Sequence, residues 1–278
     1  MPELPEVQTV VDTLNRCGIV GRTIDGALIR WSKTIACESP ACFCRRIRGR
    51  RIERITRRGK YIVFHLSGGL SLLIHLRMTG RLNWTRRDRA LNTHEHVILS
   101  VGPHHELRFQ DTRKFGRIVL TDAPKAVLGK LGPEPLSRGF TRERFFTMLQ
   151  ARKRQLKPLL LDQTFLAGLG NIYVDEALWQ ACIHPCRRSD SLTRKETDAL
   201  HRAIRKVLNQ GLKNQGTSLG SGQGNFHAVD DRPGRNADQL NVFRRTAAPC
   251  PRCRATIQRI VVGQRSSHIC PVCQQAPG

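Results

Sequence analysis

The sequence opens with Met1-Pro2-Glu3-Leu4-Pro5-Glu6-Val7, and we interpret the rest of the chain as a support for this segment. A small second residue favours removal of the initiator methionine, which would leave Pro2 with a free secondary amine. Such an α-amine titrates near pH ~8, so a useful fraction is an unprotonated nucleophile at neutral pH. Its attack on an aldehyde-level sugar carbon would give an iminium, and Glu3 is the candidate general acid beside it.

The same segment also fits an ordinary helix start. Pro5 suits the first helical position, and Glu6 complements the positive end of the helix dipole. The apolar residues that follow recur at helical spacing, namely Val7, Val10, Val11 and Leu14. A buried helix therefore follows the opening, and on this pattern alone it is the simpler interpretation. The remainder of the chain decides between the two.

Charge points to a polyanionic partner. The chain has 278 residues, enough for two domains, and carries 47 Lys and Arg against 22 Asp and Glu, a formal charge of +25. The excess is spread along the whole length, and 39% hydrophobic residues support a folded protein. Nucleic acid is the favoured partner and a membrane surface the weaker alternative. Neither a long apolar run nor a signal segment is evident, so we expect a cytoplasmic protein.

The cysteines predict a metal site rather than a disulfide framework. Cys250-x-x-Cys253 and Cys270-x-x-Cys273 are separated by sixteen residues, which matches the spacing of a zinc ribbon. We expect one structural Zn²⁺ there. A second metal cluster at Cys182-x-His184-x-Cys186 is a less favoured alternative. The cysteines outside the quartet are interpreted as free thiols: Cys17, Cys37, Cys42, Cys44, Cys182 and Cys186.

An all-β region is predicted from about residue 22 to 122, because short runs rich in Ile, Val, Leu and aromatics alternate with turn residues. Gly68-Gly69 marks one hairpin turn. Such a series indicates a sandwich or barrel. Alternation puts His94 and His96 on one strand face, where a solvated or phosphate-facing pair is favoured over a metal site. The expected strands are Thr23–Trp31, Arg51–Ile55, Tyr61–Leu66, Ser71–Leu76, His96–Val101, Leu107–Phe109 and Arg117–Leu120.

Beyond a Pro/Gly connector at residues 132–139 the pattern becomes helical. Thr141 opens one predicted helix, and Thr193-x-x-Glu196 is a capping box in front of another. Gly168–Tyr173 forms a glycine turn that leads into a helix, where backbone N–H groups can hold a phosphate.

The C-terminal part of the chain is expected to contain a loop and a small metal-held unit. Gly216–Gly234 is too polar to build a core and is interpreted as a mobile loop. Strands at Leu240–Phe243 and Ile257–Val262 are expected around the cysteines. So small a unit needs the metal in order to fold.

Taken together, these segments resemble the formamidopyrimidine-DNA glycosylase family of bacterial base-excision enzymes. The resemblance covers nearly the whole chain, and its motifs occur in the right order. They are the opening Pro2–Val7, Arg58–Tyr61, His75–Gly80, Asp111–Gly116, Leu131–Leu136, Gly168–Tyr173, Ile183–Pro185, Gln264-Arg265 and the cysteine quartet.

The resemblance implies an α+β fold. An N-terminal helix and a β-sandwich would form a catalytic domain over residues 1–131, with a linker at 132–139. A helix-two-turns-helix domain with a mobile lesion loop would occupy 140–235 and a β-hairpin zinc finger 236–278. Double-stranded DNA would bind between the two domains, and we expect a monomer.

The resemblance also implies a mechanism. The damaged nucleotide would be flipped out of the stack, Pro2 would attack the sugar carbon and expel an oxidised purine, and Glu3 would assist by proton transfer. The resulting Schiff base would lead to β,δ-elimination of the strand. Lys60 matches a lysine that assists catalysis beside the phosphate, and Arg265 the zinc-finger arginine tied to the second elimination.

Further positions match DNA contacts of the family, namely His94, Arg113, Arg152 and Asn171. Met78, Arg113 and Phe115 match the three side chains that fill the gap left by the flipped base. Judged without the family, Met78 and Phe115 fit sandwich core, and Lys60 and Arg265 fit ordinary surface cations.

Several departures bear on specificity. Gly222-Gln223-Gly224-Asn225-Phe226 is a variant of the loop that covers the flipped base, and Phe243 replaces a usual tyrosine. Two alternatives remain open. One is a glycosylase of the endonuclease VIII type acting on oxidised pyrimidines, and the other is a non-catalytic DNA-binding zinc protein. Leu4, Val7 and the complete Met78/Arg113/Phe115 set speak against the former, and intact Pro2, Glu3, Lys60 and Arg265 against the latter.

Overall fold

The first helix, α1 (Leu4–Arg16), begins at the opening segment that the sequence marks as a helix start. Glu3 is the N-cap residue, and the Glu6 carboxylate accepts a hydrogen bond from the Glu3 backbone N–H at 2.8 Å. The sequence suggested Pro5 as the first helical residue, but the helix begins one residue earlier, so Pro5 is the second. The apolar stripe is buried as predicted, with Val7, Val10, Val11 and Leu14 all in the main core.

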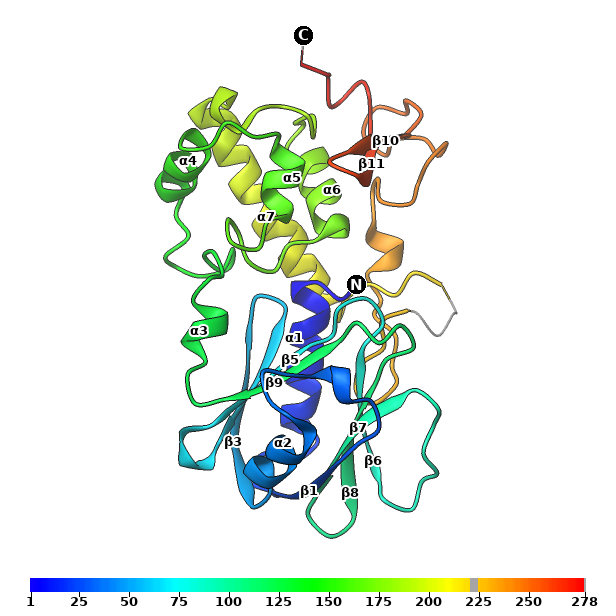
Figure 1. The fold of residues 1–278 in the computed structure, drawn as a ribbon. Coiled ribbons are helices and arrows are strands. Elements are labelled where there is room, and N and C mark those ends of the chain that lie inside the picture. The colour runs from blue at the N-terminus through cyan, green and yellow to red at the C-terminus, as the bar shows by residue number, and fades with distance from the viewer. Residues whose placement is uncertain (221–224, 278) are drawn as a thin grey trace. The chain divides into compact units, whose positions relative to one another are not determined.

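The computed structural model describes residues 1–220 and 225–277, and the chain divides into two units (Figure 1). The first comprises Met1–Lys130 with Leu212–Ala237, and the second comprises Leu131–Gly211 with Asp238–Gly278. The polar segment before Ala237, which the sequence interpretation placed in the helical domain, thus packs with the first unit. Gly222-Gln223-Gly224 of the variant loop lies outside the described residues.

Described residues of the first unit form a nine-stranded sheet in the order β2-β9-β5-β4-β3-β1-β7-β8-β6. Pairing is antiparallel apart from the short parallel pair β2–β9. The strands are β1 Thr23–Ile29, β2 Ile35–Ala36, β3 Arg50–Arg58, β4 Tyr61–Leu66, β5 Ser71–His75, β6 Arg81–Arg86, β7 Glu95–Val101, β8 His105–Gln110 and β9 Arg117–Thr121.

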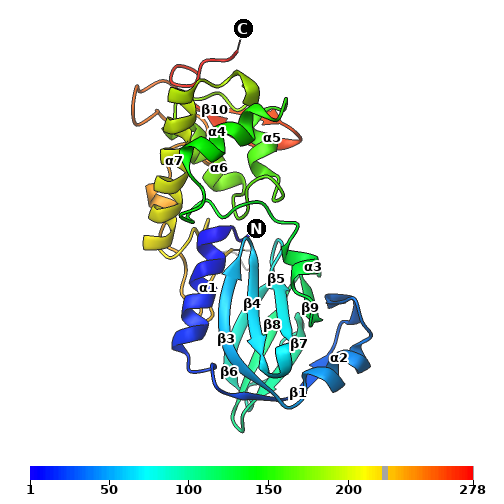
Figure 2. The same ribbon diagram turned by 90° about the vertical axis from the view of Figure 1, so that its left-hand side faces the viewer.

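The sheet folds into two layers at the junction of β1 and β3. These strands pair only through Thr23↔Arg51 and Ile24↔Arg50, after which β1 continues along β7. Figure 2 shows β3, β4 and β5 as one layer in front of β6, β7 and β8, with α1 beside β3. The sandwich predicted from the strand pattern is therefore confirmed.

Side-chain alternation explains how the layers pack. On β4, Ile62, Phe64 and Leu66 point into the main core, where Val97 and Leu99 come from the opposite layer. Val63 points to the other face and joins a smaller cluster with residues of β5, β9 and α3 (Lys125–Leu128). The buried side of the sandwich thus continues into α1, which is how the core positions the N-terminus.

Several elements of the first unit were missed, among them β2 and α3, and one strand of the second was wrongly predicted. β6 and α2 (Pro40–Ile47) were not expected, although Ser39 caps α2 by accepting from the Cys42 N–H at 3.3 Å. Residues 240–243 do not form the expected strand. Instead, the backbone N–H groups of Asn241, Val242 and Phe243 all donate to the buried Glu176 carboxylate at 2.9–3.0 Å. A distant carboxylate therefore replaces strand pairing there.

The second unit is mainly helical and ends in a hairpin. Thr141 caps α4, and the Thr193/Glu196 capping box precedes α7, both as predicted. The α-helices are α4 Arg142–Gln150, α5 Leu156–Leu161, α6 Asn171–Gln180 and α7 Arg194–Lys213, and the hairpin strands are β10 Gln258–Val262 and β11 Arg265–Ile269. Short 3-10 turns lie at Ser32–Thr34, Ser67–Gly69, Ser189–Ser191 and Ala237–Gln239.

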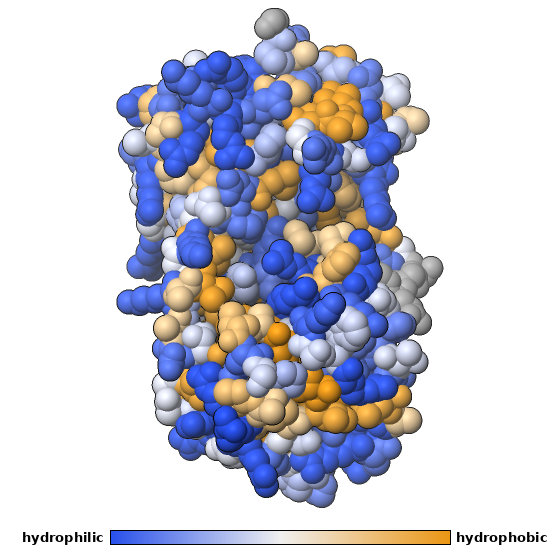
Figure 3. Space-filling model, viewed as in Figure 1, coloured by the Kyte–Doolittle hydropathy of each residue, from blue (hydrophilic) through white to orange (hydrophobic). Residues whose placement is uncertain are grey.

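The surface reflects the composition. Hydrophilic side chains cover much of the face shown in Figure 3, with hydrophobic side chains scattered between them. Within the described residues, none of the helices is both long enough and apolar enough to span a membrane.

Candidate functional site

The first two candidate residues lie at the start of α1. Pro2 and Glu3 are buried, whereas Met1 is 47% exposed. Glu6, itself buried, uses one carboxylate oxygen for the Glu3 N–H and the other for the Thr217 N–H at 2.7 Å. Gly216 has φ +87°, and a Cβ there would lie 2.9 Å from the Glu6 side chain. From the sequence, Glu6 was expected only to complement the helix dipole, whereas in the structure it links the N-terminus to residues 216–217.

Lys60 lies in the turn between β3 and β4 and is buried. His75 lies close enough for its charge to matter: burial, then Arg77 and Lys60, lower the pKa of His75 to about 3. Its Nδ1 accepts the Arg77 backbone N–H at 3.0 Å, and its ring packs edge-on against Tyr61. His75 is therefore a neutral imidazole near neutral pH and adds no positive charge beside Lys60.

Met78, Arg113 and Phe115 are exposed, so the alternative that Met78 and Phe115 are sandwich core is wrong. The Arg113 guanidinium carbon lies 4.8 Å from the centre of the Phe115 ring, a cation–π contact. Exposed apolar side chains of this size call for an explanation in terms of a partner surface.

His96 in β7 and His94 just before this strand differ in environment. His94 is partly exposed, whereas His96 is buried and its Nε2 donates to the Asp111 carbonyl at 2.8 Å. Burial is the main cause of the lowered pKa of His96. The interpretation of a solvated or phosphate-facing pair therefore fails for His96, which has a structural partner.

In the second unit, the helix that begins with Asn171 is hydrogen-bonded to the strand that begins with Arg265. Asn171 begins α6, and its Nδ2 donates at 3.0 Å to the carbonyl of Ser266, the residue after Arg265 on β11. Its buried Oδ1 has no hydrogen-bond partner in the described chain. The Arg265 side chain is exposed. Asn171 thus helps to hold the strand that carries Arg265.

A buried ion pair, which sequence reasoning missed, holds the same strand. Lys157 Nζ donates to Asp175 at 2.6 Å and to the Ser266 carbonyl at 2.7 Å. The second Asp175 oxygen accepts the His268 backbone N–H at 2.9 Å. No local pattern signals such a pair, because its members are far apart in the sequence.

Arg152 is exposed just after α4. With Arg144 and Arg154 it lines a hollow of about 370 Å³ in the second unit. Arg154 is paired with Asp162 at 2.9 Å. The hollow therefore has an excess of positive charge, which suits a phosphate.

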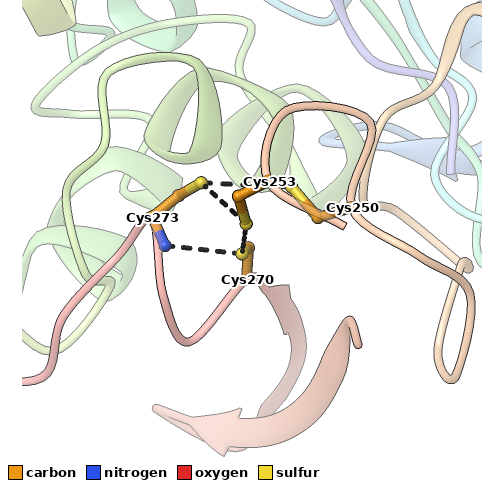
Figure 4. Close-up of side chains that lie close together, drawn as sticks. All are labelled: Cys250, Cys253, Cys270 and Cys273. Carbon is orange, nitrogen blue, oxygen red and sulfur yellow. Dashed lines mark hydrogen bonds between the residues drawn. The ribbon is translucent and has the colours of Figure 1, made fainter. Parts of the chain in front are cut away.

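The four predicted zinc ligands come together (Figure 4). Their sulfur atoms all lie within 4.8 Å of one another, and the Cys253–Cys270 and Cys250–Cys273 separations are 3.3 and 4.0 Å. A tetrahedron with Zn–S bonds of about 2.3 Å has sulfurs about 3.8 Å apart. These residues therefore fit one Zn²⁺ in a closed structural site. Among the described residues, Cys182, His184 and Cys186 do not gather into a metal-binding group.

Electrostatics of the quartet also call for a cation. Burial opposes the Cys250 thiolate, but N–H donors of Cys253, Trp179 and Arg252 outweigh it and lower the pKa of Cys250 to about 6. Burial and the neighbouring sulfurs raise the pKa of Cys273 to about 12. Without metal the quartet would hold a mixture of thiols and thiolates, whereas bound Zn²⁺ favours thiolates throughout.

Three family models match in chain order. They are the formamidopyrimidine-DNA glycosylase N-terminal domain over residues 1–118, the H2TH domain of the same family over 131–222, and a zinc finger found in FPG and IleRS over 248–276. A protein named formamidopyrimidine-DNA glycosylase from Protochlamydia amoebophila is 44% identical over 275 residues, covering 99% of this chain and 100% of that protein. This chain belongs to the formamidopyrimidine-DNA glycosylase family.

Solved structures of formamidopyrimidine-DNA glycosylases agree with this placement. A mutant of the Lactococcus lactis enzyme in complex with Fapy-dG containing DNA superposes with a TM-score of 0.91 at 35% identity, covering 99% of this chain and 100% of that one. The same enzyme with abasic-site DNA gives 0.90 at 35% identity and equal coverage. The predicted α+β fold, the H2TH domain and the zinc finger are thereby confirmed.

Proposed function

We propose that this protein is a bifunctional DNA glycosylase and AP lyase that removes oxidised purines, 8-oxoguanine and formamidopyrimidines, from double-stranded DNA. The observation that carries the proposal is the N-terminus. Pro2 and Glu3 are buried, and the Glu6 carboxylate accepts the backbone N–H groups of Glu3 and Thr217. The similar Lactococcus lactis enzyme forms complexes with Fapy-dG containing DNA and with abasic-site DNA, which supports a DNA substrate for this protein.

Chemistry begins at the Pro2 nitrogen once Met1 is removed. The amine lone pair forms a bond to C1′ of the flipped nucleotide as the bond from C1′ to the base breaks, and the base leaves with a proton. The nitrogen gives its proton to the departing base, Glu3 protonates the ring oxygen O4′, the C1′–O4′ bond breaks, and the nitrogen lone pair forms the C=N bond of the iminium. Burial of Glu3 excludes bulk water from this transfer.

Strand cleavage follows from the iminium. It acidifies the C2′ hydrogen, whose removal expels the 3′-phosphate in β-elimination, and a second elimination expels the 5′-phosphate. Lys60 is assigned to the phosphate beside the first step and Arg265 to the second. His75 near Lys60 is neutral, so within this pair Lys60 is the cation that would meet the phosphate.

Binding is assigned to charge and to an apolar wedge. His94, Arg152 and Asn171 would contact the backbone, consistent with a formal charge of +25. Met78, Arg113 and Phe115 would fill the gap left by the flipped nucleotide, and their exposure supports this role. Zinc, held by the four cysteines, has a structural role and takes no part in any step.

The proposal also includes a cellular compartment and an oligomeric state. The structure describes all ten cysteines and none of them forms a disulfide, which supports a reducing, cytoplasmic compartment. A monomer is proposed because the family domains together provide both the catalytic residues and the DNA contacts within one chain.

Borohydride trapping tests the mechanism. Protein with Met1 removed should form a covalent adduct on a duplex containing 8-oxoguanine opposite cytosine, and peptide mapping should place the link at Pro2. A matched sample that retains Met1 should give no adduct. Attachment at Lys60, or full activity with Met1 retained, would contradict the mechanism. Trapping on oxidised pyrimidines instead of purines would support the endonuclease VIII alternative, and no adduct with any lesion would support the non-catalytic one.

A further inference from the structure

Asp111 is a buried carboxylate with several partners from separate segments. Its side chain is 0% exposed. Oδ1 accepts the Thr79 hydroxyl and the Arg113 backbone N–H, the latter at 3.2 Å. Oδ2 accepts the Gly116 backbone N–H at 2.7 Å. A carboxylate buried in this way is stabilised by such donors, and removing it leaves them unsatisfied.

The backbone of Asp111 adds two more links. Its N–H donates to the His94 carbonyl at 2.9 Å, and its own carbonyl accepts from His96 Nε2 at 2.8 Å. One residue therefore joins three stretches of chain: residues 76–80, 94–96 and 111–116.

Two of these stretches, 76–80 and 111–116, carry the exposed residues assigned to the wedge. Met78 immediately precedes Thr79, Arg113 donates its own N–H to Asp111, and Phe115 immediately precedes Gly116. The hydrogen bonds of the carboxylate thus end at Arg113 itself and at the residues that directly follow Met78 and Phe115.

The two loops need an external tie because their backbones are strained. Arg77 has φ 54° and Lys114 has φ 60°, in the left-handed region that non-glycine residues avoid. At Gly116 a Cβ would lie 2.3 Å from the Phe109 ring, so the chain passes closer to the core than a side chain would allow. Such conformations persist where surrounding contacts enforce them, and the Asp111 carboxylate makes three of these contacts.

We propose that Asp111 is a positioning residue that sets Met78, Arg113 and Phe115 as one rigid unit and thereby determines the preference for the base opposite the lesion. The inference rests on the proposed function for its DNA role. Arg113 offers only donors, which suit the acceptor edge of cytosine, so its position relative to the orphaned base controls discrimination. Asp111 acts through the backbone and needs no contact with DNA or with the reacting sugar.

Two substitutions separate this role from general folding. In Asp111→Asn an NH₂ group replaces one acceptor, so it must face either Gly116 N–H or the Thr79 and Arg113 donors. Thr79→Val keeps the shape of the side chain but removes the hydroxyl that ties the Met78 loop. Thr79→Ser retains the hydroxyl and is the matched control.

Hydrogen exchange of the full protein without DNA is the first measurement. Asp111→Asn should raise exchange in residues 76–80 and 111–116 together, by about tenfold or more for a lost hydrogen bond to a charged group. Thr79→Val should raise it in both segments, because the Thr79 hydroxyl donates to Asp111 and also accepts the Arg113 backbone N–H at 3.3 Å. Thr79→Ser should match the unmodified protein. Unchanged exchange in Asp111→Asn, or a change confined to one segment, would overturn the inference.

Excision of 8-oxoguanine opposite cytosine and opposite adenine is the second measurement, and trapping on a preformed abasic site is the third. Asp111→Asn and Thr79→Val should lower the cytosine-to-adenine rate ratio by about tenfold. Trapping through Pro2, measured with enzyme in saturating excess over the abasic duplex, should stay within about threefold, because saturation removes the contribution of the wedge to binding. The positioning role is overturned if this rate ratio is unchanged in both variants, or if the unmodified protein excises equally fast opposite cytosine and adenine. Absence of trapping in the unmodified protein overturns the proposed function instead, while exchange still reports on Asp111.

Discussion

The N-terminal region and the zinc hairpin hold their functional residues by different means. Pro2 and Glu3 begin a helix whose apolar stripe is part of a large core shared by both layers of the sandwich. The hairpin region has a small cluster of five buried residues, and two of these are zinc ligands: Trp179, Val242, Cys250, Ile257 and Cys270. Around it, carboxylates replace apolar burial, with Glu176 holding residues 241–243 and Asp175 holding Lys157 and His268.

This difference shows which perturbations each region should resist. A large core tolerates the loss of single polar contacts, because apolar area supplies most of its stability. A small cluster depends on its metal and on paired charges, and breaking one buried pair costs about 3–5 kcal/mol. The two regions should therefore fail independently, and each prediction below tests that expectation.

Zinc removal should have the largest effect. Cys250→Ser should lose the metal, whose binding contributes about 10–16 kcal/mol in zinc-finger peptides, and duplex affinity should be lost with it. The β-sandwich should stay folded, as judged by hydrogen exchange of the β4 and β5 amides. Metal content and gel-shift affinity are the measurements. Cys186→Ser, outside the quartet, is the control and should retain both. Unchanged affinity in a metal-free variant would contradict the comparison.

The second-largest effect is expected from low pH, which should destabilise the first unit. The pKa of His75 is lowered to about 3 from 6.5, so the unfolded chain binds a proton that the folded chain excludes. Stability should therefore fall as the pH drops below about 6.5, by up to about 4 kcal/mol near pH 3. His75→Gln should remove this component of the pH dependence. Urea unfolding at each pH measures the stability. The exposed His104→Gln is the control. An identical pH slope in all three proteins would show that His75 is not held neutral.

A smaller effect is expected from the wedge. Arg113→Ala should lose much of the preference for excision opposite cytosine over adenine. A lost charged hydrogen bond is worth about 1.5–3 kcal/mol, or about one to two powers of ten in rate. Single-turnover rates on the two duplexes measure it, with the neighbouring Lys114→Ala as control. Equal rates opposite cytosine and adenine in the unmodified enzyme would make Arg113 a phosphate contact only.

The smallest effect concerns the exposed cations of the second unit. Arg152→Ala should reduce the slope of log affinity against log salt by about 0.9, the value for one phosphate contact. Lesion preference should not change. Arg194→Ala, an arginine that stacks on Phe146, is the comparison. An altered lesion preference with the slope intact would mean that Arg152 reads bases.

Local patterns in the sequence predicted more of the fold than of the site's support. The α1 stripe, the Thr193/Glu196 capping box and the cysteine quartet follow from spacing, because each depends on neighbours a few residues away. Glu176 was missed for the opposite reason: its partners are more than sixty residues further along the chain. The missed helix α2 is different, since Ser39-Pro40 is a helix-start signal that was available in the sequence.

The candidate site shows the same division. The family motifs named Met78, Arg113 and Phe115, but their exposure is visible only in the structure. Asp111 and Glu6 were quoted within motifs without a positioning role, since a carboxylate that accepts several backbone N–H groups has no signature of its own. Pro2, Glu3, Lys60 and Arg265 stay assigned as predicted until the trapping experiment tests them.

The uneven exposure of the zinc ligands has a consequence under oxidative stress. Cys250 and Cys270 are buried, whereas Cys253 is exposed. Peroxide reacts with accessible thiolates, so Cys253 is the sulfur it would reach first, and oxidation there would release the metal. Oxidants that damage guanine would then also inactivate the protein proposed to repair it. The dose at which Cys253 is oxidised would set an upper limit on the oxidant exposure under which repair can continue.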